Sequence, residues 1–271
     1  MNRYVPTRII NAHSHYHPGE LEQTAERWRA AGLRKMCMCG IGEQNTMDVL
    51  ACSKRYPDLV VPFGYIELRK MDPNEVDRRK EQGFVGLKFI NAPVPYGDER
   101  LMPIYERAAK YNMPAVFHTG WLSGPGPIRS LNMMPSELEP ILRVCPKWKI
   151  VAAHLGNFWC EDAVGLMQHH NNVYFDLSGG TVRKFAPSRL RSLFTRQPDK
   201  NLRVIEDVVD YSLFAKLVFA TDNPPLEELL EFYVNFLNWM EVPVEIQNRI
   251  YYGNMAAMLG MADEPLAQAA S

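Results

Sequence analysis

Short apolar runs alternate along the chain with longer segments in which apolar residues recur with a helical period. Eight runs rich in β-branched and aromatic residues predict strands over residues 8–15, 35–40, 59–67, 85–90, 114–120, 149–156, 173–178 and 216–222. Most of these runs are apolar at consecutive positions rather than at alternate ones. That pattern is typical of parallel strands that are covered on both faces.

The segments between these runs predict helices. They cover approximately residues 20–31, 45–56, 73–82, 102–112, 136–144, 161–170, 201–212 and 226–240, with one or two more helical elements over 244–260. Residues 226–240 carry an apolar stripe with the spacing i, i+3, i+4, i+7. Glycine and proline predict a long loop around Gly124–Pro127 and a second one over 179–198 that contains a helical piece.

Eight strands that are each followed by a helix form the pattern of a closed (β/α)8 barrel. We therefore predict an α/β fold with a single TIM-barrel domain over residues 1–271 and an extra C-terminal helix. An open doubly wound sheet is the alternative. The absence of a GxGxxG turn after the first run weakens that alternative.

Charge and composition exclude several classes of function. The net charge of −1 indicates neither a nucleic-acid-binding surface nor a polybasic membrane patch, and no apolar run approaches the length of a membrane span. The N-terminus lacks the apolar core of a signal peptide, and the five cysteines form no CxxC pair. We expect a cytoplasmic protein that acts on a small molecule, with a possible homodimer through the last apolar helices.

Titratable side chains stand at the ends of the predicted strands, where the active sites of (β/α)8 barrels lie. They are His13 and His15 on the first strand, His118 on the fifth, His154 on the sixth and Asp222 on the eighth. A single strand-end histidine is more often structural, but that explanation does not extend easily to five residues at matching positions. Imidazole nitrogens with one carboxylate suit Zn²⁺, with Mn²⁺, Fe²⁺ and Ni²⁺ as alternatives. The sequence therefore predicts one divalent metal ion.

The stretch IINAHSHYH holds three histidines within five residues. Side chains alternate along a strand, so His13, His15 and His17 all fall on one face if the strand continues. His17 precedes Pro18 and is expected to lie past the strand end. Glu67, Asp176 and Ser178 are candidates for pocket lining, with nothing in the sequence to rank them.

The ordered set HxH, HTG, HLG and TDNP resembles the amidohydrolase superfamily. The closer resemblance is to the amidohydrolase-2 group, which includes aminocarboxymuconate-semialdehyde decarboxylase, related aromatic-acid decarboxylases and lactone hydrolases. The segments GFVGLKF, LMPIYERAAKYNMPAVFHTG and YYGNMAAMLG look like that group's corresponding segments, so the resemblance covers nearly the whole chain.

The resemblance implies a role for each matching residue. His13, His15, His118 and Asp222 match the metal ligands, and Asp222 also matches the residue that takes a proton from metal-bound water. His154 matches a histidine that acts in catalysis beside the metal. Many relatives carry Asp at the position of Asn11; an amide there is expected to hydrogen-bond near the site.

Lys88 and Trp121 are expected to bind the substrate. Some superfamily members use a carboxylated lysine at the Lys88 position to bridge two metals, whereas the GLKF context favours an unmodified lysine that faces a substrate carboxylate. The resemblance implies a metal-dependent hydrolase that acts on an amide, lactone or other ester of a small, carboxylated substrate. A non-oxidative decarboxylase of an aromatic or unsaturated acid is the alternative, and a non-catalytic binding protein is a third hypothesis.

Overall fold

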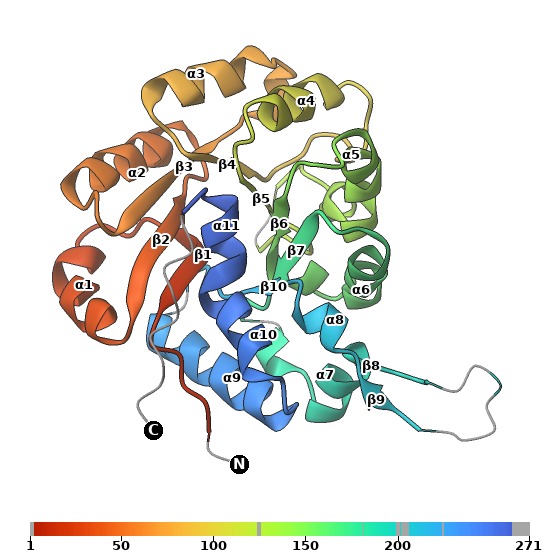
Figure 1. Cartoon of the computed structure of the whole chain (residues 1–271). Coiled ribbons are helices and arrows are strands. Elements are labelled where there is room, and N and C mark those ends of the chain that lie inside the picture. Colours follow the sequence, from red (N-terminus) through yellow and green to blue (C-terminus); the bar gives the residue numbers. More distant parts are fainter. Residues whose placement is uncertain are drawn as a thin grey trace.

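The computed structural model describes residues 3–123, 126–180, 182–198, 201, 206–223 and 225–261. Eight parallel strands form one sheet in chain order, and each coincides with a predicted strand. They are β1 (Ile9–His15), β2 (Leu33–Cys39), β3 (Val60–Tyr65), β4 (Gly86–Phe89), β5 (Ala115–Phe117), β6 (Ile150–Ala152), β7 (Val173–Asp176) and β10 (Leu217–Val218). The predicted (β/α)8 barrel is confirmed (Figure 1).

The last strand returns to the first and closes the ring. The Ala12 N–H donates to the Phe219 carbonyl at 2.9 Å, and the Asp222 N–H donates to the His13 carbonyl at 2.8 Å. Ser14 and Asp222 form a parallel bridge at the same seam. Residues from the two ends of the chain therefore meet at the carboxyl end of the barrel.

Helices cover the outside of the ring (Figure 1). In α9, the stripe formed by Leu226, Leu229, Tyr233 and Leu237 is buried, as its helical spacing predicts. No helix in the described ranges has the length and apolarity that a membrane crossing requires. Eight of the α-helices are α1 (Glu20–Ala30), α2 (Glu43–Arg55), α3 (Asn74–Gln82), α4 (Met102–Lys110), α5 (Glu139–Val144), α6 (Cys160–His169), α7 (Pro187–Leu193) and α9 (Leu226–Trp239).

Short 3₁₀ turns occupy several of the connections. They are η1 (Leu68–Lys70), η2 (Ser130–Met133), η3 (Pro135–Leu138), η4 (Ala153–Gly156) and η5 (Val182–Lys184). The predicted helix over 136–144 is thus divided between η3 and α5. The second predicted long loop contains η5 and α7, as expected, whereas Gly124 and Pro125 of the first lie outside the described residues.

The predicted helix over residues 201–212 is wrong. Val208–Val209 forms strand β9, which pairs antiparallel with β8 (Thr195–Arg196). Helix α8 (Tyr211–Phe214) begins only after Asp210, whose side chain accepts a hydrogen bond from the Ser212 N–H. Two adjacent β-branched residues and a capping carboxylate favour a strand that ends before a new helix. Residues 202–205 lie outside the described part of the chain.

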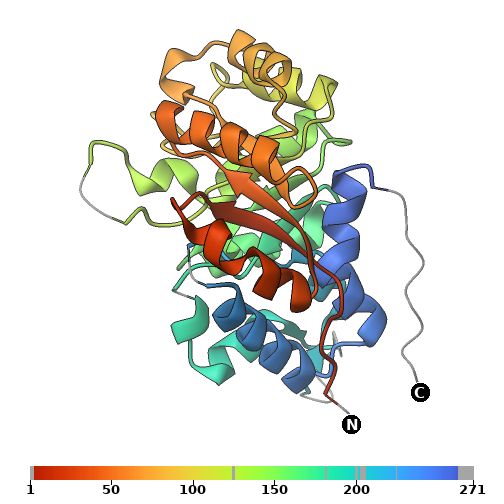
Figure 2. The ribbon, with the colours of Figure 1, turned by 90° about the vertical axis from the view of Figure 1, so that its left-hand side faces the viewer.

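The C-terminal helical segment closes the amino end of the barrel. It consists of α10 (Val244–Asn248), a π-helical turn (Arg249–Gly253) and α11 (Asn254–Met258). In the π-turn, the Ile250 carbonyl accepts a hydrogen bond from the Phe219 N–H at 2.9 Å. Figure 2 shows α11 and the segment after β5 that contains η2 at opposite ends of the barrel. The predicted extra C-terminal helix is confirmed.

Candidate metal centre

Strand β1 carries His13 and His15, and the Nδ1 atom of each ring has a hydrogen-bond partner. His15 Nδ1 lies 2.9 Å from the Cys39 carbonyl, which can only accept, so this nitrogen carries the proton. His13 Nδ1 lies 3.3 Å from an Asp176 carboxylate oxygen. In the neutral rings, both Nε2 atoms are therefore left as bare acceptors, which is the state that binds a metal.

The acceptor atoms of three residues converge. His13 Nε2 lies 3.2 Å from His15 Nε2, and an Asp222 carboxylate oxygen lies 3.1 Å from His15 Nε2 and 3.6 Å from His13 Nε2. Ligand atoms that are 2.0–2.1 Å from a tetrahedral Zn²⁺ lie about 3.3 Å apart. Acceptors this close repel one another unless a cation or a shared proton lies among them.

Asp222 adopts a left-handed backbone conformation, with φ of 63°, directly after β10. Burial alone would raise the pKa of its carboxyl, but the close contact with His15 and the neighbouring imidazoles of His154 and His13 hold this pKa well below its usual range. Asn223 Nδ2 donates to the second carboxylate oxygen at 3.0 Å. Asp222 therefore stays ionised and keeps one oxygen directed at the histidines.

His118 follows β5 and carries a buried Nε2 that has no hydrogen-bond partner among the described residues. Its ring centroid lies 5.1 Å from that of His154. Burial, with smaller contributions from His154 and Lys88, lowers its pKa well below the ordinary histidine value. A neutral buried imidazole with a free nitrogen is a costly arrangement that a bound ion would satisfy.

His154 lies on a backbone segment of unusual geometry. Residues 154–158 all have positive φ values, of 65°, 46°, 73°, 33° and 66° in sequence order. The His154 N–H donates to Asp176 at 2.8 Å, and its Nδ1 lies 2.9 Å from the Ser178 hydroxyl oxygen. Gly179 also has positive φ, and a Cβ there would lie 3.3 Å from His154 Nδ1. The backbone is therefore held in a strained form that points the imidazole at the site.

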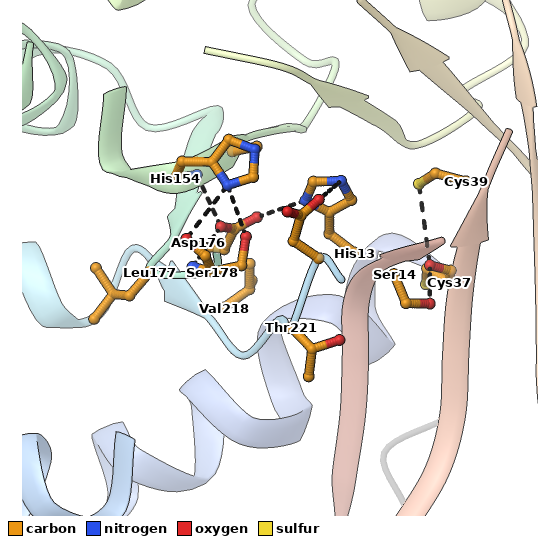
Figure 3. A network of polar contacts seen from close by, with 12 residues as sticks. His13, Ser14, Cys37, Cys39, His154, Asp176, Leu177, Ser178, Val218 and Thr221 are labelled. Atoms are coloured by element: carbon orange, nitrogen blue, oxygen red, sulfur yellow. Dashed lines mark hydrogen bonds and ion pairs between the residues drawn. The ribbon is translucent and has the colours of Figure 1, made fainter. Parts of the chain in front are cut away.

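Asp176 organises this end of the barrel, although the sequence gives no reason to rank it above other strand-end residues. It is completely buried, and its two oxygens accept from His13 Nδ1, the His154 N–H and the Ser178 N–H. Figure 3 shows Asp176 between His13 and His154. These bonds keep the pKa of Asp176 low despite its burial. Its only signal in the sequence is a carboxylate that ends the apolar run VYFD.

The amide nitrogen and the amide oxygen of Asn11 both form hydrogen bonds with Thr221, where β1 meets the segment after β10. Its Nδ2 donates to the Thr221 hydroxyl at 2.8 Å, and its Oδ1 accepts from the Thr221 N–H at 3.2 Å. An ionised aspartate has no donor for the first of these bonds. The amide therefore suits its position, and it hydrogen-bonds near the site as expected.

Lys88 enters the site from β4. Its side chain is completely buried, and its Nζ lies 2.8 Å from His13 Nε2. Burial lowers the pKa of this lysine. Substrate binding by Lys88 stays a prediction, and its side chain points at the predicted metal ligand His13.

The other predicted residues lie around the mouth. Trp121 is 53% exposed and stacks on Trp159 with ring centroids 5.5 Å apart. Glu67 makes an ion pair with Arg69 rather than with the metal candidates. His17 is exposed and follows the end of β1, so it lies outside the cluster, as expected.

The donor set fits a divalent ion. Within the described ranges, one group of three residues has ligand atoms that all lie within 4.8 Å of one another, namely His13, His154 and Asp222. His15 joins His13 and Asp222 at the distances given above, and His118 supplies the free nitrogen. Imidazoles with one carboxylate match zinc and the related transition metals. Which four of these five residues bind the ion stays a prediction.

The sequence matches the model of the amidohydrolase family (amidohydrolase-2) over residues 16–261. The chain belongs to this family. The match begins directly after β1, so His13 and His15 are supported by their place in the barrel rather than by the match itself. The family is one of metal-dependent enzymes, which agrees with the donor set. No curated protein matches the sequence of this family member.

Solved structures share the barrel of this amidohydrolase. An uncharacterised TIM-barrel protein from Bordetella bronchiseptica aligns with a TM-score of 0.66 and 19% identity, over 89% of this chain and 83% of the other. A 2,6-dihydroxybenzoate decarboxylase from Rhizobium aligns with a TM-score of 0.62 and 15% identity, over 94% and 99%. A probable 2-pyrone-4,6-dicarboxylic acid hydrolase from Acinetobacter baumannii gives 0.62 and 14%, over 94% and 100%. At these identities the likeness establishes the fold, which carries both hydrolases and decarboxylases.

Proposed function

We propose that this amidohydrolase is a metal-dependent hydrolase that opens an amide, lactone or other ester bond of a small carboxylated substrate. The convergence of His13 Nε2, His15 Nε2 and an ionised Asp222 oxygen within 3.1–3.6 Å of one another carries the proposal. When bound there, a divalent ion polarises a carbonyl and lowers the pKa of water to about 7. Zn²⁺ is the first candidate, followed by Mn²⁺, Fe²⁺ and Ni²⁺.

Asp222 is proposed to move the proton. Its carboxyl pKa is held low, so the group is a carboxylate at neutral pH and can accept a proton from the attacking water. Asn223 holds the second oxygen at 3.0 Å, which leaves the first one facing the histidines. The same carboxyl would then pass the proton to the leaving group.

His154 is proposed to stabilise the oxyanion that develops on the substrate carbonyl. Its Nδ1 is nearer to the Ser178 hydroxyl, at 2.9 Å, than to the Ser178 carbonyl, at 3.3 Å. A hydroxyl can donate to Nδ1, and Nε2 then carries the proton that the oxyanion needs. The strained backbone around residue 154 fixes this ring before the substrate arrives.

Substrate binding is proposed for Lys88 and Trp121. The amine of Lys88 suits a substrate carboxylate near the metal, and the exposed face of Trp121 suits an apolar or planar part of the substrate at the mouth. The cytoplasmic location and the homodimer stay predictions.

Two measurements on the purified protein test the proposal. Metal analysis should find about one divalent ion per chain. A panel of lactones, amides and aromatic carboxylic acids, assayed in parallel for acid release and for CO₂ release, should give acid release. CO₂ release without hydrolysis would reject the hydrolase and support the decarboxylase instead. A chain that retains no metal and turns over none of the panel would reject both.

A further inference from the structure

Lys88 has an unusual environment for a lysine. Its side chain is completely buried in the centre of the barrel, yet no carboxylate among the described residues makes an ion pair with it. Its hydrogen-bond partner is His13 Nε2, at 2.8 Å. A buried lysine without a paired acid is costly, so this contact needs an explanation beyond packing.

The contact competes with the metal for one pair of electrons. His13 Nδ1 faces the Asp176 carboxylate and carries the ring proton, so Nε2 has a single lone pair to offer. That lone pair can accept an N–H from Lys88 or bind an ion, but it cannot do both. The neighbouring His15 Nε2 and the Asp222 oxygen offer Lys88 no second contact of comparable length.

We propose that Lys88 is a placeholder for the metal. Without the ion, an N–H of Lys88 engages the lone pair of His13 Nε2 and holds this ring in the position from which it binds the metal. When the ion binds, Lys88 gives up His13 and becomes available to a substrate carboxylate. Lys88 therefore weakens metal binding by the free energy of the contact it loses, and it stabilises the metal-free barrel. This inference rests on the proposed metal-dependent function.

The test compares the wild type with Lys88→Met, which keeps an unbranched chain of similar length and removes the donor. Zn²⁺ affinity is measured by competition with a chromophoric chelator, and thermal unfolding is followed with and without Zn²⁺. The variant should bind Zn²⁺ about tenfold more tightly, as expected for the loss of one competing hydrogen bond. Its metal-free form should unfold at a lower temperature, so the rise in melting temperature on adding Zn²⁺ should exceed that of the wild type.

Lys216→Met is the matched control. The Lys216 ammonium is half-buried and donates to the carbonyls of Met167 and His170, away from the metal candidates. Its loss should lower the melting temperature equally with and without Zn²⁺ and leave Zn²⁺ affinity unchanged. If Lys88→Met does not fold without metal, Lys88→Leu, a shorter apolar side chain without a donor, takes its place in the same measurements.

Each outcome of these measurements either supports or contradicts the proposed role of Lys88. Tighter Zn²⁺ binding by Lys88→Met, together with a less stable metal-free form, supports the proposed role of Lys88. Unchanged or weaker binding by both Lys88 variants overturns it, and so does a wild type that binds two ions when Lys88→Met binds one, which would indicate a carboxylated lysine. A wild type that binds no Zn²⁺, Mn²⁺, Fe²⁺ or Ni²⁺ would instead reject the proposed function itself.

Discussion

The two ends of this barrel are built from the same eight strands but differ in the side chains that they bury. At the amino end, apolar side chains inside the ring pack against the C-terminal segment, with Val61, Val116 and Val218 meeting Tyr252 and Met255. At the carboxyl end, the buried groups are histidines, carboxylates and a lysine. The barrel thus draws stability from one end and keeps polar, strained groups at the other.

The backbone differs in the same way. Several non-glycine residues in the left-handed region, among them His154, Leu155, Phe158 and Asp222, lie at the carboxyl end, and each costs about 1–2 kcal/mol. Specific contacts hold this conformation: the Thr119 hydroxyl donates to the Ala153 carbonyl at 2.5 Å, directly before the strained turn. The amino end instead contains a π-helical turn. The Ile250 carbonyl in this turn accepts a hydrogen bond from the N–H of Phe219, the residue that follows β10.

The largest expected effect is at the carboxyl end. Asp222→Asn should lower kcat by about 10²–10⁴-fold, because an amide cannot take the proton, while the fold is largely preserved. Steady-state kinetics and thermal unfolding check this. Asp210→Asn is the control, since this carboxylate caps α8 and pairs with Arg196 away from the site, and asparagine also caps helices. Full activity of Asp222→Asn would remove it as the proton carrier.

Next in size is the loss of the ion. His13→Ala and His15→Ala should each abolish stoichiometric metal binding, because each removes an Nε2 from the converging set. His17→Ala should keep the metal, since His17 lies beyond the end of β1. The metal content of each of the three variants after dialysis checks both expectations. Equal retention by all three variants would show that the site lies elsewhere.

The amino end is tested by Met255→Ala. Met255 is 1% exposed and packs inside the base of the ring, so the substitution should cost about 2–5 kcal/mol of unfolding free energy. Metal content and kcat should stay close to those of the wild type at temperatures where the variant is folded. A large fall in kcat without a fall in stability would mean that the two ends are coupled.

A smaller effect is expected at adjacent glycines. Gly179→Ala introduces a Cβ at φ of 78° and 3.3 Å from His154 Nδ1, so it should lose about 1–2 kcal/mol of stability and also lower kcat. Gly180→Ala is the control, because a Cβ there has nothing within 4 Å. Chemical denaturation gives the unfolding free energy of both variants, and steady-state kinetics gives their kcat. Identical behaviour would contradict the view that this backbone positions His154.

The smallest effect is expected at the mouth. Trp121→Ala should raise KM several-fold with little change in kcat, because a remote contact binds substrate and transition state alike. Trp239→Ala is the control, since Trp239 has a similar exposure, at 47%, but lies on the outer helix α9. Equal KM values for the two variants would exclude Trp121 from substrate binding.

The sequence predicted the barrel well because its strands are local features. Each buried strand is an apolar run, and a run such as GLKF keeps that signal even with a lysine inside it. The helix predicted over 201–212 failed because Val208–Val209 takes its structure from pairing with Thr195–Arg196, a partner that helical periodicity does not reveal.

The site was predicted in part for a similar reason. Histidines and an aspartate at strand ends indicate metal chemistry wherever they meet, so His13, His15 and Asp222 could be named as candidates from position, and the resemblance implied their roles as ligands. The role of Asp176 depends on His13, which is 163 residues away in the chain, and the contact of Lys88 depends on a side-chain direction. Neither is encoded in a local pattern.

The seam between β10 and β1 also constrains how the protein is made. His13 emerges from the ribosome long before Asp222 and the Ile250 carbonyl that bonds to Phe219. Contacts this distant in sequence form late in folding. A nascent chain therefore carries His13 and His15 without the carboxylate that completes the cluster until Asp222 has been synthesised. Capture of the ion should accordingly report that the whole ring has closed.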